Sequence, residues 1–111
     1  KETFGYVAEE LGKRQIAFIF TREYLAEDSI SAYLKERSGV PYIANMRLDA
    51  QTAKELLASG KADAVSFGKA YIANPDLYQR LMSNAPLNEL NTTTMYGFGP
   101  EGYTDYPTMA I

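Results

Sequence analysis

Residues 62–81 read ADAVSFGKAYIANPDLYQRL. The segment opens with residues 62–67, which we expect to form a strand because they have strand length and are followed by a turn residue. Gly68 follows as a turn residue, and a short helix is expected over residues 75–84, with Asn74 as its N-cap and proline at its first position. A strand, a glycine turn and a helix in this order form one β/α unit of an α/β fold.

Further β/α units precede this segment. We expect a helix over residues 2–13 and then a strand over 16–20 that is buried on both faces. The next unit has a helix from Asp28 or Ser29 to Arg37, which ends at Gly39, and a strand over 42–45. A third helix is expected over 50–59, with Asp49 as N-cap and with Ala53, Leu56 and Leu57 facing inward. Strands that alternate with helices predict parallel pairing through right-handed crossovers.

The remainder, residues 85–111, is rich in Pro, Asn, Gly, Thr and Tyr without any period, which predicts an ordered tail clamped against the units of residues 1–84. Three parallel strands leave two apolar edges unpaired, which proteins normally cover. We therefore interpret residues 1–111 as one segment of a single (β/α)8 TIM-barrel domain, about strands 6 to 8, with an extra short helix and an extended tail. An independent three-layer sandwich is the alternative that the pattern leaves open.

Composition narrows the class of partner. Hydrophobic residues make up 46% and charged residues 23% of the 111 residues, as in folded globular proteins. The net charge is -3 and no run of Lys and Arg is present, which argues against nucleic acid or an anionic membrane surface as partner. No stretch approaches the roughly 20 apolar residues of a membrane span. A small or neutral partner is expected.

The chain contains neither cysteine nor histidine. Disulfides and thiolate metal sites are excluded, and the commonest general base is missing. The lack of cysteine fits a reducing cytoplasm, which we expect as the compartment. Because an acid or base must come from elsewhere, and because the chain opens on Lys1 rather than Met, we expect a preceding segment of the protein.

The loops after two strands form a candidate anion site. Met46 and Arg47 follow the strand over 42–45, and Gly68 and Lys69 follow the next strand. Barrels bind phosphate at the carboxyl ends of their last strands, where backbone N–H groups and a cation meet the oxygens. The alternative is that Gly68 merely turns the chain and that both cations are solvated. The spacing matches neither a P-loop nor a dinucleotide fingerprint.

The combination of FGK, IANPDL, PLN and GYTDYP, in order between about residues 18 and 107, resembles the carboxy-terminal part of the Old Yellow Enzyme family. Members are (β/α)8 barrels with non-covalent FMN, which NADPH or NADH reduces and which passes hydride to the β-carbon of an activated alkene. The resemblance implies FMN as cofactor, an enone-type substrate and ene-reductase activity.

The resemblance also implies residue roles. Met46 and Arg47 would lie where backbone amides meet the FMN phosphate, and Gly68 and Lys69 would complete that site. Family members most often have Arg where this chain has Lys69, which keeps the charge but lacks the planar fork. Tyr96 falls where the family places an aromatic residue beside the substrate pocket. Its alternative is one more packed tyrosine among nine.

The family's catalytic groups are not expected in this chain. A His-His or His-Asn pair polarises the substrate carbonyl in the family, and a chain without histidine cannot hold that pair. The remaining amino-terminal part of the barrel, a separate chain or a part lost by cleavage, would supply it, and the isolated chain should be inactive. The competing hypothesis is a non-catalytic half-barrel that binds a phosphate-bearing ligand or a protein through its open edges.

Overall fold

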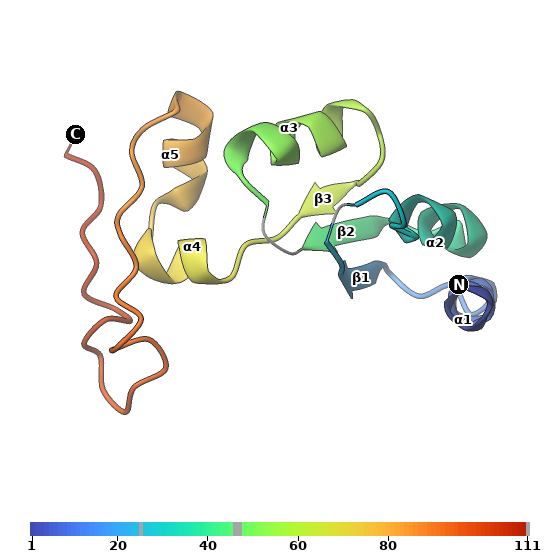
Figure 1. The fold of residues 1–111 in the computed structure, drawn as a ribbon, viewed down its shortest axis with the longest axis horizontal. Coiled ribbons are helices and arrows are strands. Elements are labelled where there is room, and N and C mark those ends of the chain that lie inside the picture. The colour runs from blue at the N-terminus through green and yellow to red at the C-terminus, as the bar shows by residue number, and fades with distance from the viewer. Residues whose placement is uncertain (25, 46–47, 111) are drawn as a thin grey trace. The chain divides into compact units, whose positions relative to one another are not determined.

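The computed structural model describes residues 1–24, 26–45 and 48–110. They form two compact units, Lys1–Ser66 and the segment from Phe67 onward. The first unit contains, in chain order, α1 (Glu2–Lys13), β1 (Ile19–Arg22), α2 (Ser31–Ser38), β2 (Tyr42–Asn45), α3 (Ala50–Ala58) and β3 (Ala64–Val65) (Figure 1). The second contains α4 (Lys69–Ala73) and α5 (Leu77–Ser83), followed by the tail.

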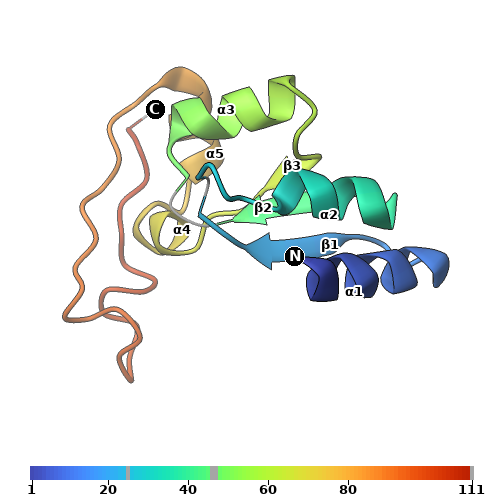
Figure 2. The ribbon, with the colours of Figure 1, turned by 45° about the vertical axis from the view of Figure 1, so that its right-hand side comes forward.

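The strands form a parallel sheet in the order β1-β2-β3, with Ile19 opposite Tyr42 and Ile43 opposite Ala64 (Figure 2). The alternation of helices with parallel strands confirms the α/β prediction. β1 lies later than the predicted strand over 16–20, and β3 is shorter than the one over 62–67. Pairing with the four-residue β2 sets these bounds: the N–H of Ile19 donates to the carbonyl of Pro41, just before β2.

The core of the first unit lies between the sheet and α3. Its buried members are Tyr42, Ala44, Leu56 and Ala62, with Ile19, Leu48 and Val65 packed against them. The Tyr42 hydroxyl is hydrogen-bonded to Thr21 on β1, which satisfies a polar group at the edge of the core. Phe20 on β1 is about half exposed, so the prediction that this strand is buried on both faces is wrong within the described residues.

The helix α1 packs against α2. Gly12 makes this packing close, because a Cβ at its position would lie 2.0 Å from the carbonyl oxygen of Ser38. An ion pair between Glu9 and Arg37 joins the exposed sides of the two helices. Gly39 ends α2 with a φ of 66°, as predicted from its position after the helix.

The start of α2 differs from the prediction. The helix begins at Ser31 with Ile30 at the N-cap position, and Glu23 holds the residues before it: one carboxylate oxygen accepts the N–H of Ile30 at 2.7 Å and the other accepts the hydroxyl of Ser29 at 3.1 Å. The N-cap is thus neither Asp28 nor Ser29.

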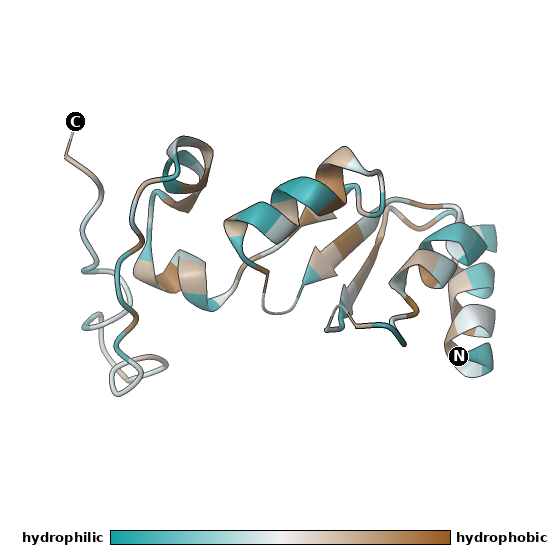
Figure 3. Cartoon of the chain, turned by 45° about the horizontal axis from the view of Figure 1, so that its top comes forward, coloured by the Kyte–Doolittle hydropathy of each residue, from teal (hydrophilic) through white to brown (hydrophobic). Residues whose placement is uncertain are grey.

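The helix α3 matches its prediction closely. The carboxylate of Asp49 accepts the N–H of Thr52 at 2.7 Å, as an N-cap does. Ala53 and Leu56 are buried, whereas Leu57 is exposed, against expectation. Figure 3 shows hydrophilic and hydrophobic bands along α3, in keeping with a helix that has one buried face.

The helix predicted over residues 75–84 is present as the shorter α5, and α4 precedes it as an additional helix. The predicted N-cap, Asn74, instead lies between α4 and α5 in an extended conformation, which the following Pro75 favours. The amide nitrogen of Asn74 donates back to the carbonyl of Ala70 at 2.9 Å, so its side chain closes α4 rather than capping α5. Asp76 stands at the N-cap position of α5, and Leu77 is fully buried.

No helix within the described ranges has both the length and the apolar character required to cross a lipid bilayer.

Candidate functional site

The carboxyl ends of β2 and β3 are tied together by one side chain. The amide nitrogen of Asn45, the last residue of β2, donates to the carbonyl of Ser66 at 3.1 Å and to its hydroxyl at 2.6 Å. Because neighbouring parallel strands end at the same edge of a sheet, the chain leaves β2 and β3 at adjacent points. This edge is where α/β proteins bind ligands.

Met46 and Arg47, two of the residues predicted to bind phosphate, come directly after Asn45 in the sequence and lie outside the described residues. Their role stays a prediction.

Gly68 occupies the N-cap of α4, and its carbonyl accepts the N–H groups of Tyr71 and Ile72. Its φ of -96° is accessible to any residue, and a Cβ built on it would meet no heavy atom within 4 Å. Neither backbone conformation nor packing in the described residues thus requires glycine to turn the chain. The open space beside its Cα leaves room for a ligand to approach the backbone.

Lys69 begins α4, and its side chain is exposed. In any α-helix the first N–H groups lack an intrahelical acceptor, which here applies to Lys69 and Ala70. The start of α4 therefore offers backbone donors and a positive charge at the same place, which is the donor set that suits an anion.

Tyr96 lies in the tail, and 72% of its surface is exposed. Its φ of 63° is left-handed, which is uncommon for a residue with a large side chain. Among the described residues Tyr96 is therefore not a packed core tyrosine. Tyr103 is also exposed, whereas the hydroxyl of Tyr106 accepts the N–H of Asn91 at 2.9 Å.

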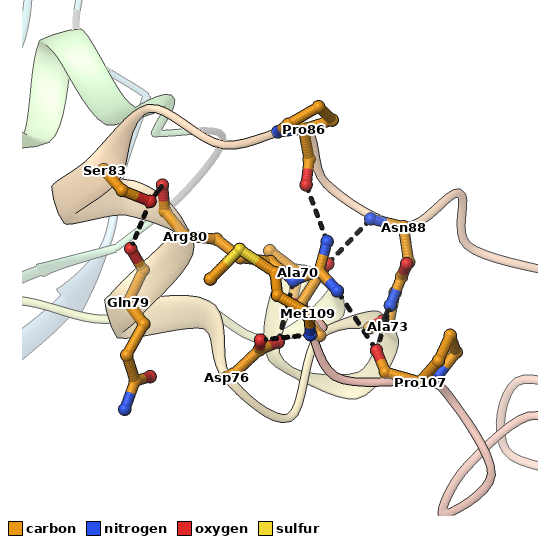
Figure 4. Close-up of polar contacts among 11 residues, drawn as sticks. Ala70, Ala73, Asp76, Gln79, Arg80, Ser83, Pro86, Asn88, Pro107 and Met109 are labelled. Atoms are coloured by element: carbon orange, nitrogen blue, oxygen red, sulfur yellow. Dashed lines mark hydrogen bonds and ion pairs between the residues drawn. The ribbon is translucent and has the colours of Figure 1, made fainter. Parts of the chain in front are cut away.

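The sequence analysis missed a buried polar cluster that holds the tail, centred on Arg80 (Figure 4). Arg80 is only 7% exposed. Its Nε donates to Asp76 at 2.7 Å, its Nη1 to the carbonyl of Pro86 at 2.6 Å and its Nη2 to the carbonyl of Pro107 at 3.1 Å. The i,i+4 spacing of Asp76 and Arg80 could have indicated an ion pair between them. The carbonyl partners of Arg80 could not be found in this way, because they are distant in sequence.

Two further side chains complete this cluster, which we call the tail clamp: Asn74, Asp76, Arg80 and Asn88. The side chain of Asn88 donates to the carbonyls of Ala73 and Pro107, both at 2.8 Å, while its backbone N–H donates to the side-chain oxygen of Asn74 at 2.7 Å. Asn74 is 1% exposed. The polar side chains of the clamp therefore form hydrogen bonds that join residues 74–80 to residues 86–88 and 107–109.

The carboxylate of Asp76 also binds the far end of the tail. Its second oxygen accepts the N–H of Met109 at 2.8 Å. This backbone hydrogen bond, followed by that from Arg80, holds the pKa of Asp76 below its usual value. The carboxylate is thus ionised at neutral pH and balances the charge of the buried guanidinium.

Among the residues that the structure describes, no group of three or more potential ligands could hold a metal ion. The acidic residues with lowered pKa values, such as Glu9 and Asp63, are paired with cations or backbone N–H groups. Asp63, for example, accepts from Lys35 at 3.0 Å and from the N–H of Tyr42 at 2.8 Å, which gives it a structural role.

No family model matches the chain. Individual proteins do match. A probable flavin mononucleotide-dependent alkene reductase from Leishmania infantum is 34% identical over 107 residues, which are 94% of this chain and 29% of that protein. The chain thus spans about three tenths of the length of this relative.

Solved structures of other proteins also resemble this chain. An old yellow enzyme homologue from Zymomonas mobilis superposes with a TM-score of 0.88 at 35% identity, over 96% of this chain and 32% of that one. Morphinone reductase in complex with tetrahydroNAD superposes with a TM-score of 0.88 at 37% identity, over 96% of this chain and 30% of that one. Likeness in both sequence and structure, over nearly the whole chain, confirms the resemblance, and the chain belongs to the Old Yellow Enzyme family.

Proposed function

We propose that this chain is the carboxy-terminal part, about strands 6 to 8, of a TIM-barrel ene-reductase that uses FMN and NADPH or NADH in the cytoplasm. The proposal is supported by relatives that are described as a flavin mononucleotide-dependent alkene reductase and as a reductase in complex with a nicotinamide analogue. Its substrates are activated alkenes of the enone type.

The observation that carries the proposal is the link between Asn45 and Ser66. It fixes the ends of β2 and β3 side by side, and the two proposed phosphate-binding pairs are the residues that follow these ends. Met46 and Arg47 would offer backbone N–H groups to the FMN phosphate. Gly68 and Lys69 would complete the site with a close backbone approach and a positive charge.

The described residues fit an FMN phosphate. The backbone at Gly68 has open space beside it, and the exposed Lys69 starts a helix whose first N–H groups lack intrahelical acceptors. When bound, FMN would accept hydride from the nicotinamide and deliver it to the β-carbon of the alkene. The chain's own part is to hold the phosphate end of the cofactor and, through Tyr96, to form one wall of the substrate pocket.

The chain does not polarise the substrate carbonyl, because it has no histidine for that task. We propose that the remaining amino-terminal part of the barrel supplies this pair and the proton donor, and that the isolated chain does not turn over substrate.

A charge reversal at Lys69 tests the phosphate site. In the assembled reductase, Lys69→Glu should weaken FMN binding roughly 10- to 100-fold, because a charge-assisted hydrogen bond is replaced by repulsion of the phosphate. Lys69→Arg should bind FMN as well as the wild type. The measurement is the FMN dissociation constant, from quenching of flavin fluorescence.

Lys61→Glu is the matched control, since Lys61 is also exposed and the change in net charge is the same. Equal FMN affinity of Lys69→Glu and Lys61→Glu would remove Lys69 from the site. A colourless protein that forms homo-oligomers and binds no flavin would instead favour the non-catalytic half-barrel.

A further inference from the structure

The tail clamp holds the two ends of one long loop. Pro86 and Pro107 lie on opposite sides of residues 89–106, and the guanidinium of Arg80 binds the carbonyls of both. Asn88 binds the Pro107 carbonyl as well, at 2.8 Å. The loop thus begins and ends at a fixed point on α5, although its ends are distant in sequence.

We infer that Arg80 is a positioning residue for the substrate pocket: by fixing both ends of the loop over residues 89–106, it sets where Tyr96 lies. The inference rests on the proposed function, since it takes Tyr96 to form a wall of that pocket. Arg80 itself does not touch the substrate, and its effect reaches the pocket through the loop.

The chemistry of arginine suits this task. A planar guanidinium presents N–H groups in several fixed directions, and Arg80 uses three of its nitrogens for Asp76, Pro86 and Pro107. A lysine ammonium is a single nitrogen on a flexible stem and does not reproduce that arrangement. Asp76 compensates the buried charge of Arg80, and it also fixes the end of the tail by accepting the N–H of Met109.

Contacts between the two limbs of the loop restrict the position of its tip, where Tyr96 lies. The hydroxyl of Tyr106 accepts the N–H of Asn91, which pairs the two limbs just above the clamp. Gly102 lies so close to Thr94 that a Cβ on it would be 1.8 Å from the Thr94 hydroxyl oxygen. These two contacts join the limbs on either side of Tyr96.

Tyr96 needs such support. Its left-handed φ of 63° is unfavourable for a residue with a side chain, and a strained conformation persists only where the surroundings impose it. The tip has little apolar packing of its own, because Phe98 and Tyr103 are exposed along with Tyr96. Hydrogen bonds therefore hold the loop, both those at its base and those between its limbs, such as the one from Asn91 to Tyr106.

The test compares Arg80→Met with Gln79→Met in the assembled reductase. Both place the same side chain on α5, but Gln79 is exposed whereas Arg80 is buried. We measure hydrogen exchange of the amides in residues 89–106, the FMN dissociation constant, and KM and kcat for cyclohexenone. Asn88→Ala serves as a second, milder variant that removes the side-chain donor to Pro107 and Ala73 but leaves Arg80 in place.

Arg80→Met should speed amide exchange throughout the loop and raise KM about tenfold, with FMN still bound. Asn88→Ala should do the same to a smaller extent, and Gln79→Met should match the wild type. In a Tyr96→Ala background, Arg80→Met should no longer raise KM, because the residue through which it acts is gone.

Unchanged exchange in the loop for both Arg80→Met and Asn88→Ala would overturn the inference, as would a KM effect that persists in full without Tyr96. If Tyr96→Ala alone leaves KM unchanged, the proposed pocket role of Tyr96 fails. That result is distinct, because the exchange measurement still reports whether Arg80 holds the loop.

Discussion

The role of a glycine depends on what surrounds its Cα. Gly102 has a φ of 69° and Thr94 against it, so no larger residue fits there without strain. Gly68 has neither constraint. Neither packing nor φ requires glycine at position 68, and we propose that the FMN phosphate accounts for it there.

Gly68→Ala tests this directly. The melting temperature of the flavin-free protein should stay close to that of the wild type, because the added methyl group enters open space at a normal φ. FMN affinity should fall, because the methyl group keeps the phosphate from the backbone. The measurements are thermal unfolding without flavin and a flavin titration. Wild-type affinity of Gly68→Ala would place the phosphate elsewhere.

At the scale of elements, local signals predicted some helices and strands well. The helix over residues 2–13 and the strand over 42–45 match α1 and β2, and the N-cap of α3 is Asp49 as expected. These features depend on periodicity and on side chains within one turn, which the sequence displays directly.

The errors in the predicted helix caps have a common physical cause: the side chains concerned form hydrogen bonds with residues that are distant in the chain. Asn74 resembles an N-cap in the sequence, but its side chain binds Asn88, fourteen residues later. At the start of α2, Glu23 accepts the N–H of the N-cap residue Ile30, seven residues later. The residues proposed for FMN and substrate came from the family resemblance, whereas Arg80, whose partners are backbone carbonyls, carried no pattern that a sequence alone reveals.

The contact between α1 and α2 leads to a prediction about Gly12. Gly12→Ala should destabilise the protein by about 1–3 kcal/mol, as overpacking does. Alanine favours a helix by up to about 1 kcal/mol over glycine, but here its Cβ meets the backbone carbonyl of Ser38 at 2.0 Å, and relief requires the helices to separate. The measurement is the free energy of unfolding in urea.

Gly5→Ala in the same helix is the control. Its Cβ would meet the end of the Tyr33 side chain, which can rotate, rather than backbone. Gly5→Ala should therefore destabilise less than Gly12→Ala, and the reverse order would contradict the described packing of α1 on α2.

The contact between α5 and the end of the tail should depend on pH. The pKa of Asp76 is lowered in the folded state from its usual value of 3.8. Its ionised form therefore stabilises the folded state at pH values above 3.8, and this contribution is lost as the pH falls through the lower folded-state pKa. The tail should loosen in acid, below pH 3.8, and stay attached at neutral pH.

Asp76→Asn isolates this contribution from that of other carboxylates. At pH 7 the variant should show faster exchange of the Met109 amide than the wild type, because an amide side chain cannot accept from both Arg80 and Met109 through two oxygens. The difference should shrink as the pH falls through the folded-state pKa of Asp76, which lies below 3.8, because the wild-type carboxyl then becomes protonated. A difference that stays constant across this range would contradict the role given to the charge.

At the scale of the whole molecule, the described sheet has two edges, β1 and β3, each paired on one side only with β2. Exposed aromatic residues such as Phe18 and Phe20 lie on or next to β1. Apolar strands with open edges are normally covered, and the rest of a barrel would cover both.

Mixing the isolated chain with the remaining part of the barrel tests this assembly. Neither part alone should reduce cyclohexenone, and the mixture with FMN and NADPH should restore turnover together with a bound flavin absorption band. Native mass spectrometry should show one copy of each part. Turnover by the isolated chain would contradict the absence of the carbonyl-polarising pair from it.

The closed base of the loop over residues 89–106 has a consequence for protein engineering. Because Arg80 and Asn88 bind backbone carbonyls at its ends, they hold the loop without regard to the side chains between. The entropic penalty of closing a flexible loop rises by only about 0.6 kcal/mol when its length doubles. The segment between the limbs should therefore accept new lengths while the contacts at its base stay the same, and, if Tyr96 lines the substrate pocket as we propose, such changes would alter substrate preference.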